Sequence, residues 1–372
     1  MRFPEFTEEW EETTLGKISE ITKGSGISKD QLSEQGSPCI LYGELYTKYK
    51  SEIIDEVYSR TELDSSSLVK SKANDVIIPC SGETAIDIST ARCVPFNNIL
   101  LGGDLNIIRL KHDDGGFFAY QLNGARKKDI ARVAQGVSVV HLYGENLKHI
   151  RVYHPAIEEQ KKITRLLSLI DERIATQNKI IEDLKLLKSA ISLNVLHSDT
   201  WEQFKIKDIA QIGRGRVISS IEISQQKNPT YPVYSSQTSN DGIMGYLDDY
   251  MFEGEYISWT TDGANAGTVF YRNGKFNCTN VCGLLKFIKG FDTHFVSLVL
   301  AEATKKYVSI NLANPKLMNN TMGNIQICLP KLEEQKRISI VFRVLQRLWT
   351  VHNSLLTEYI KQKQYLLSQM FI

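Results

Sequence analysis

The feature that most constrains this chain is an internal repeat. Residues 10–24 (WEETTLGKISEITKG) match residues 201–215 (WEQFKIKDIAQIGRG), and residues 155–163 (PAIEEQKKI) match residues 330–338 (PKLEEQKRI). Similar ends around dissimilar middles predict one folding unit that is used twice with different contents. The 372 residues allow each half a core of its own.

The two middles are predicted to be similar mixed α/β domains, an α+β class of fold. Short β-branched and aromatic runs separated by Gly, Asn and Pro are typical of strands. We align residues 75–78 with 255–258 and residues 108–110 with 285–287 as matching strands. Residues 272–275 (RNGK) have the composition of a hairpin turn.

A long helical pattern follows each domain, opened by a proline and two glutamates, as a helix N-terminus favours. The expected order is a first mixed domain at 1–155, a central helix at 156–197, a second mixed domain at 198–330 and a C-terminal helix at 331–372. Each helix of about 40 residues would span about 60 Å. Because the first helix leads from the first domain to the second, and the second helix starts at the second domain, the two can pair only in antiparallel orientation.

Apolar residues recur along both helices with the 3.5-residue spacing of a coiled-coil seam. Polar residues interrupt the two seams at equivalent places, Gln177 with His352 and Lys188 with Lys363. The alternative is a pair of amphipathic helices, each buried against its own domain. The predicted apolar seam positions are Ile163, Leu167, Ile170, Ile174, Ile181 and Leu184 in the first helix, and Ile338, Phe342, Leu345, Trp349, Leu356 and Tyr359 in the second.

Composition argues against several classes of function. With 44 basic and 43 acidic residues the chain lacks the basic excess of a simple nucleic-acid binder. No phosphate-binding loop, methyltransferase motif or metal-binding pair of histidines occurs, so we expect no catalytic residue and no metal site. The six cysteines show no CxxC spacing and favour buried thiols. No signal peptide or membrane span is evident, which predicts a cytoplasmic protein.

The repeated motifs resemble those of the DNA-specificity subunit of bacterial type I restriction-modification systems. The similarity includes the tryptophan that starts each half and the Pro-x-Ile/Leu-Glu-Glu-Gln-Lys that opens each helix. Residues 231–236 (YPVYSS), 240–246 (NDGIMGY) and 261–267 (TDGANAG) are also similar to that family. The first half departs from the pattern, with LYGE at 41–44 and SGETAI at 81–86. Such a departure is expected where the two domains read different bases.

The resemblance implies a non-catalytic subunit that recognises double-stranded DNA. Each domain would read one half of a bipartite, asymmetric target, and the two helices would set the gap and dock two modification subunits. Restriction subunits are a further possible partner. The chain itself would hold no cofactor, and S-adenosylmethionine, ATP and Mg would belong to the partner subunits. The alternative is a two-headed scaffold that binds a protein or a glycan.

Candidate phosphate contacts come from basic residues at matched positions in the two halves. Lys23 matches Arg214 beside Gly24 and Gly215, where a small residue allows a phosphate to approach closely. Solvated surface charge is the competing interpretation. The complete set is Lys23, Arg126, Lys127 and Lys128 in the first half and Arg214, Arg216, Lys305 and Lys306 in the second.

Candidate base contacts are loop residues with hydrogen-bonding side chains. Many such residues only stabilise turns, which is the alternative at each position. The candidates are Tyr42, Glu44, Tyr46, Ser81, Glu83, Gln135, Ser138 and His141 in the first half, and Ser236, Gln237, Asn240, Asp262, Asn265, Asn314 and Lys316 in the second.

Overall fold

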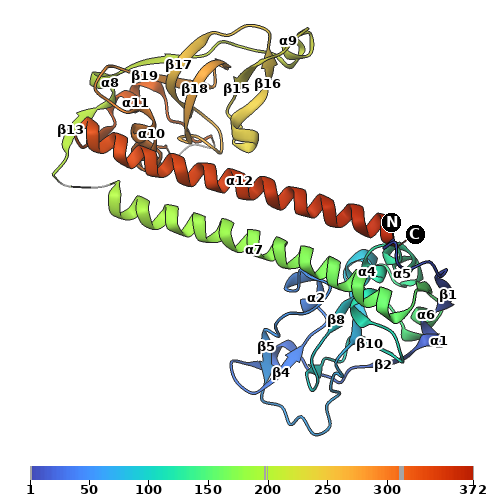
Figure 1. The fold of residues 1–372 in the computed structure, drawn as a ribbon. Helices are drawn as coiled ribbons and strands as arrows, with labels where there is room; N and C mark the ends of the chain where they lie inside the picture. The colour runs from blue at the N-terminus through green and yellow to red at the C-terminus, as the bar shows by residue number, and fades with distance from the viewer. Residues whose placement is uncertain (1, 197, 199, 310–313, 372) are drawn as a thin grey trace. The chain divides into compact units, whose positions relative to one another are not determined.

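The computed structural model describes residues 2–196, 198, 200–309 and 314–371. The chain divides into two compact units, residues 1–180 with 352–372 (unit 1) and residues 181–351 (unit 2). Two helices of 39 residues, α7 (Ile157–Val195) and α12 (Leu332–Met370), each contribute one part to unit 1 and the other part to unit 2 (Figure 1). Both helices begin just after the prolines that the sequence marks, Pro155 and Pro330.

Unit 1 contains mainly short strands. The strands are β1 (Glu11–Thr14), β2 (Ser19–Lys23), β3 (Leu32–Ser33), β4 (Ser37–Ile40), β5 (Ser59–Thr61), β6 (Asp75–Pro79), β7 (Ser81–Gly82), β8 (Arg92–Val94), β9 (Leu100–Leu101), β10 (Leu105–Leu110), β11 (Val140–His141) and β12 (Arg151–His154). The helices before α7 are α1 (Leu15–Ile18), η1 (Lys29–Gln31), α2 (Glu44–Thr47), α3 (Ala85–Ile88), α4 (Gly115–Asn123), α5 (Lys127–Val133) and α6 (Gly144–Lys148).

Unit 2 has longer strands. They are β13 (Glu202–Lys205), β14 (Ala210–Arg214), β15 (Tyr231–Tyr234), β16 (Ile243–Leu247), β17 (Phe252–Thr260), β18 (Val269–Cys278), β19 (Cys282–Phe287) and β20 (Gln326–Leu329). The helices before α12 are α8 (Ile206–Ile209), α9 (Ser220–Ser224), η2 (Ser239–Gly242), α10 (Thr293–Ala303), η3 (Thr304–Lys306) and α11 (Asn319–Asn324).

The two units share one sheet topology. Four strands run in the order β2-β10-β6-β8 in unit 1 and β14-β19-β17-β18 in unit 2. In both units the next strand pairing is parallel, β4 with β9 in unit 1 and β15 with β18 in unit 2. In unit 1 the parallel pair belongs to a separate sheet, whereas in unit 2 it continues the central sheet to six strands. The repeat in the sequence is therefore a repeat of fold.

The strand register corrects one of our sequence alignments. Ile108 pairs with Ile21 and Val76, and Leu285 pairs with Ile212 and Ile257. Val76 is thus the counterpart of Ile257, one residue away from the match predicted between 75–78 and 255–258. A shift of one residue moves every side chain to the other face of the strand. A short β-branched run can be aligned equally well in either of two registers that differ by one residue. Burial of one face against the core decides which register forms.

The predicted hairpin turn at 272–275 is wrong, because these residues lie in the middle of β18. Gly274 pairs with Gly254 of β17, and both have positive φ, at 100° and 102°. The Asn-Gly pair therefore produces a local distortion across a continuous ladder instead of a chain reversal. A glycine on each strand tolerates this distortion, since glycine adopts positive φ without a steric penalty.

The repeated glutamine of the Glu-Glu-Gln motif ties each long helix to its unit. The side-chain oxygen of Gln160 accepts a hydrogen bond from the backbone N–H of Asp114, and that of Gln335 accepts one from Asp292, both at 2.9 Å. Each glutamine also donates at 2.8 Å to the carbonyl of the preceding proline, Pro155 or Pro330. Asp114 and Asp292 in turn cap α4 and α10. The glutamine of the motif thus fixes the start of each long helix to its own unit.

The helices pair with each other and also enter the core of each unit. In unit 1 the start of α7, at Ile163 and Leu167, shares a core with the end of α12, at Leu366 and Met370. In unit 2 the start of α12, at Ile338 and Phe342, shares a core with the end of α7. This pairing is antiparallel in both units. The apolar positions therefore form a seam between the two helices and are also buried against the domain of each unit. All the predicted apolar seam positions are buried or half-buried.

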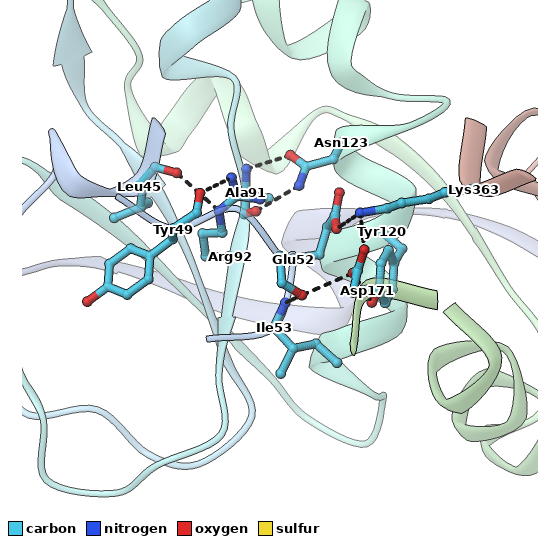
Figure 2. Close-up of polar contacts among 11 residues, drawn as sticks. Leu45, Tyr49, Glu52, Ile53, Ala91, Arg92, Tyr120, Asn123, Asp171 and Lys363 are labelled. Atoms are coloured by element: carbon cyan, nitrogen blue, oxygen red, sulfur yellow. Dashed lines mark hydrogen bonds and ion pairs between the residues drawn. The ribbon is translucent and has the colours of Figure 1, made fainter. Parts of the chain in front are cut away.

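The polar seam positions differ between the two helices. His352 and Gln177 share a hydrogen bond of 2.7 Å in unit 1. Lys363 is 14% exposed and forms ion pairs with Glu52 at 2.5 Å and Asp171 at 2.6 Å, as Figure 2 shows. Its counterpart Lys188 is exposed. Equivalent lysines therefore have different environments, one inside an ionic network and one in solvent.

Candidate nucleic-acid interface

Predicted base-reading residues of both halves lie on the segment that follows the parallel strand. In unit 1, β4 ends at Ile40 and is followed by the segment 41–47 (segment A), which carries Tyr42, Glu44 and Tyr46. In unit 2, β15 ends at Tyr234 and is followed by the segment 235–242 (segment B), which carries Ser236, Gln237 and Asn240. Ile40 and Tyr234 pair with Leu101 and Cys278 respectively. The fold thus presents the two segments at equivalent places in the two units.

A second group of predicted residues meets at the short β7–β11 ladder of unit 1. Ser81 pairs with His141, and Gln135 exchanges backbone hydrogen bonds of 2.9 and 2.7 Å with His141. Glu83, Gln135, Ser138 and His141 are exposed. This ladder brings together residues that are far apart in the sequence.

Tyr46 links segment A to this ladder. Burial raises the pKa of Tyr46, and the nearby acidic groups of Tyr42, Asp87 and Glu83 raise it further. A Cβ added at Gly82 would lie 3.7 Å from the Tyr46 hydroxyl oxygen. Segment A and the β7–β11 ladder are therefore neighbours in unit 1.

Glu44 has a different place from the other candidates of segment A. It is 6% exposed, and its carboxylate accepts hydrogen bonds from the Leu41 backbone N–H at 2.9 Å, from Lys48 Nζ at 2.6 Å and from the Ser59 hydroxyl. These contacts hold the segment in shape. The structure thus gives Glu44 an internal role, because its carboxylate oxygens are engaged within the unit, and the base contact stays a prediction.

In unit 2 three loops converge beside segment B. Asp262 forms a backbone bridge with Lys316, and Gly263 donates to the Pro315 carbonyl at 3.0 Å. The Thr260 hydroxyl donates to the Ser236 carbonyl at 3.5 Å. Asn265 and Asn314 are exposed on the same loops. The predicted base contacts Asp262 and Lys316 therefore lie on loops that contact each other beside Ser236.

Segment B ends in a tight turn. Asn240, Asp241 and Gly242 are three consecutive residues with positive φ, at 49°, 53° and 81°. Gln237 donates from its side chain to the Ile243 carbonyl, across the turn. Asn240 is exposed, whereas Gln237 and Ser236 are half-buried. Asn and Asp tolerate positive φ better than other non-glycine residues, but three such residues in succession are uncommon, and contacts from the rest of the unit help to maintain the turn.

Among the predicted phosphate contacts, Lys23 is exposed, while its match Arg214 donates from Nε to Asn319 at 2.9 Å. Arg216 forms an ion pair with Glu222, and the hydrogen bond within this pair lowers the pKa of the Glu222 carboxyl. These arginines are held by neighbours on the surface of their own unit.

The glycines beside these residues have a structural reason that differs from the expected one. A Cβ at Gly24 would lie 2.0 Å from the Gly102 carbonyl oxygen, and one at Gly215 would lie 1.8 Å from that of Cys278. Two segments of backbone touch at this point in both units. Chain packing by itself therefore requires glycine at both positions, and the approach of a phosphate there stays a prediction.

The other basic candidates differ in exposure. Arg126 lies 5.1 Å from the ring centre of Tyr153, and burial lowers the pKa of Lys127. Lys305 forms an ion pair of 2.8 Å with Glu302. Lys128 and Lys306 are exposed. The exposed members present positive charge to solvent at comparable places after α4 and α10.

The described part of the chain holds no group of three or more His, Cys, Asp or Glu residues placed to bind a metal ion. Within the same residues no helix is long and apolar enough to cross a membrane. All six cysteines are free, and five of them are buried.

Sequence reasoning missed two buried arginines, Arg92 and Arg272, which are 7% and 2% exposed. The prediction of a turn at 272–275 hid Arg272, although the preceding aromatic pair, Phe270 and Tyr271, is typical of a strand. A buried charge needs partners, and such residues often have a specific task.

Comparisons with known proteins agree with this architecture. A family model described as "Type I restriction modification DNA specificity domain" matches residues 7–186 and 198–361. A putative type I specificity subunit of Mycoplasma pneumoniae is 36% identical over 206 residues, which cover 54% of this chain and 85% of that protein. The MpnII specificity subunit of the same organism is 43% identical over 150 residues, 40% of this chain and 44% of that protein.

Solved structures show the same fold at low sequence identity. The crystal structure of a type I restriction-modification S subunit from M. genitalium matches with a TM-score of 0.74 and 16% identity, over 100% of this chain and 97% of that chain. A chain from a structural study of type I complex assembly matches with a TM-score of 0.54 and 14% identity, over 99% of this chain and 98% of that chain.

Proposed function

We propose how this chain recognises DNA from the premise that it belongs to the type I restriction modification DNA specificity family. Its curated relatives are named as type I specificity subunits, and we infer that this chain recognises DNA sequence without catalysing a reaction itself. The question is then which parts of the chain read the target.

Each unit reads one half of a bipartite, asymmetric target. The observation that supports this proposal is the combination of one sheet order in both units with unlike residues on segments A and B. A shared framework presents the segments alike, while different side chains recognise different base edges. The exposed lysines contact phosphates, which positions the unit without specifying sequence.

The helices α7 and α12 keep the two half-sites at a constant separation. Helices of 39 residues that pair with each other resist bending better than a flexible linker would. Successive major grooves on one face of DNA lie about 34–36 Å apart. The length of the gap in the target should therefore depend on helix length. Which bases are recognised should depend on the two units.

Modification subunits dock on the exposed sides of these helices. Within unit 2, α12 carries large apolar side chains that are 42–61% exposed and recur with helical spacing. A solvated apolar stripe of this kind is typical of a surface that a partner covers. Its members are Ile340, Val341, Val344, Leu348 and Val351. S-adenosylmethionine, ATP and Mg would bind to the partner subunits.

A segment exchange tests this function. Residues 220–320 are replaced by the matching segment of another family member, the chain is assembled with its modification subunits, and modified bases are sequenced in DNA from cells that carry the complex. We expect a bipartite motif in which the exchange changes one half only. The same exchange in the first unit, at residues 25–125, should change the other half. A motif that changes in both halves or in neither would contradict the proposal.

A further inference from the structure

In both units a buried arginine from the same strand of the sheet holds the segment that carries the predicted base contacts. We propose that Arg272 and Arg92 are positioning residues for DNA specificity, and that each fixes the reading segment of its own unit, segment B and segment A respectively. This inference rests on the proposed function, because it concerns how the two half-sites are read.

Arg272 is held on all sides within unit 2. Its guanidinium lies 3.6 Å from the ring centre of Tyr234 and 4.4 Å from that of Phe270. Nε donates to the Ser258 hydroxyl at 3.0 Å. The rings and the hydroxyl fix the orientation of the guanidinium plane, so its remaining donors have a defined direction.

That direction is toward the strained turn of segment B. Nη1 of Arg272 donates to the Asp241 carboxylate at 2.8 Å, and the ion pair joins a side chain that is 2% exposed to one that is 67% exposed. A Cβ added at Gly242 would lie 3.1 Å from Nη2 of Arg272, so the turn backbone lies directly against the guanidinium. Because Asn240 and Asp241 have positive φ, the turn needs an external contact to remain in this conformation.

Arg92 has the corresponding position in unit 1. It lies on β8, the strand that is topologically equivalent to β18, and is 7% exposed. Nε donates to the Leu45 carbonyl at 3.1 Å and Nη2 to the Tyr49 carbonyl at 2.8 Å, as Figure 2 shows. Leu45 belongs to α2 and Tyr49 follows it. The guanidinium thus binds carbonyl groups at the end of a helical turn, where intrahelical partners are missing.

The two arginines are not the same residue of the repeat. Arg92 pairs with Ile77 of β6, whereas Arg272 pairs with Tyr256 of β17. Since Val76 is the counterpart of Ile257, Arg272 corresponds to Val94 and not to Arg92. Two strand positions that lie two residues apart, on one face of the strand, therefore provide the same kind of anchor. Each arginine contacts the segment of its own unit. The planar fork of arginine suits this task better than lysine does.

Positioning matters because base recognition depends on donor and acceptor geometry to within about 0.5 Å. Segment B places Ser236, Gln237 and Asn240, and segment A places Tyr42 and Tyr46. A segment released from its arginine would still contain these side chains but would sample several arrangements. Discrimination between correct and incorrect bases should then fall in that half of the target only.

The test uses the assembled methyltransferase complex and duplexes that carry single base substitutions in either half-site. The readout is the methylation rate on the correct duplex divided by the rate on a substituted duplex. Asp241→Asn is the main variant, because asparagine also tolerates positive φ and position 241 is exposed, so the unit should still fold. We expect a loss of discrimination of at least tenfold in the second half-site and no change in the first. Arg272→Lys should behave likewise.

Arg92→Lys is the reciprocal variant and should lower discrimination in the first half-site alone. Glu253→Gln is the matched control, since it breaks the exposed Lys275–Glu253 ion pair of unit 2, in which neither residue is a predicted DNA contact, and it should leave both halves unchanged. Thermal unfolding establishes that each variant is folded. Equal loss in both halves, or unchanged discrimination in folded Asp241→Asn and Arg92→Lys, would overturn the inference. If the segment exchange changes one half of the motif but Asp241→Asn does not, the inference fails while the proposed function stands.

Discussion

Glycines at the end of β2 and β14 show how a single residue can be required by backbone contact. Gly24 and Gly215 occupy matched positions of the repeat, and each faces a carbonyl oxygen of the same unit at a distance that excludes a side chain. The neighbouring glycines Gly26 and Gly213 have open space around a Cβ. The pattern Gly-x-Gly therefore contains one required glycine in each unit and one that is not.

Gly215→Ala should destabilise the protein by about 1–3 kcal/mol or more, because the added methyl group forces two backbone segments apart. Gly213→Ala is the control and should be neutral or stabilising by up to about 1 kcal/mol, since alanine restricts the unfolded chain. Chemical unfolding of both variants measures the difference. Equal stability of the two variants would show that the close approach is not a constraint.

A second residue, His294, should make the stability of unit 2 depend on pH. Burial, with smaller contributions from Arg343 and Lys188, lowers its pKa to about 4 from the ordinary value of 6.5, against the opposing effect of Asp292 and Glu255. Its Nδ1 lies 2.9 Å from the Ser339 hydroxyl of α12. The ring is thus neutral in the folded protein at neutral pH.

Because the folded-state pKa lies below the unfolded one, the unfolded chain binds more protons at this site between pH 6.5 and about 4. The free energy of unfolding should therefore fall as the pH falls through this window. The contribution of neutral His294 to stability is fully present above pH 6.5. His294→Asn removes the titrating group and should give a shallower fall over the same window. Chemical unfolding of both proteins at a series of pH values measures this difference. Parallel plots of unfolding free energy against pH would contradict the lowered pKa of His294.

At the scale of elements, the seam between α7 and α12 has unequal polar positions. Lys363 of α12 bridges Glu52 and Asp171, and Asp171 also accepts hydrogen bonds from Tyr120 at 2.7 Å and from Ser51 at 3.0 Å. Burial, followed by the charge of Asp171, raises the pKa of Tyr120. This network ties α12 to α7 and to the residues that follow segment A.

Lys363→Met should destabilise unit 1 by about 3–5 kcal/mol, because it leaves two buried carboxylates without their cation. Lys188→Met is the matched control on α7. Lys188 is exposed, so its replacement should change stability by less than about 0.5 kcal/mol. Thermal unfolding of the two variants provides the comparison, and a loss of similar size in both would argue that the network contributes nothing specific.

At the scale of the whole molecule, the balance of charge limits how strongly the chain binds DNA by itself. The formal net charge is +1, and many arginines and lysines are engaged in ion pairs within their own unit. The nearly neutral bulk charge therefore gives the chain little net attraction to phosphates. We expect the isolated chain to bind DNA weakly and to need modification subunits for a firm hold on the duplex.

Fluorescence anisotropy of a labelled target duplex tests this expectation. For the complex with modification subunits, affinity should drop roughly 10³–10⁵-fold between 50 and 200 mM salt if 6–10 phosphates are contacted. The isolated chain should bind weakly at both concentrations. Strong, specific binding by the isolated chain would contradict the expectation, and a complex insensitive to salt would favour the alternative of a protein- or glycan-binding scaffold.

The sequence alone determined the features that depend on periodicity and repetition. Two units of one fold follow from the matched motifs, and the long helices with their antiparallel seam follow from the heptad spacing and from chain order, because both signals are local or recur along the chain. Candidate reading segments could also be found, since the repeat marks where its two copies diverge.

Only the tertiary structure decided the strand register, the course of residues 272–275, the internal role of Glu44 and the anchoring of segments A and B by Arg272 and Arg92. Each of these depends on which residues, distant in the sequence, come into contact. A one-residue shift of a strand, or the inward turn of a carboxylate, leaves the local composition unchanged while altering what the side chain touches. Burial and pairing are properties of the packed chain, and a sequence pattern specifies them only where it repeats.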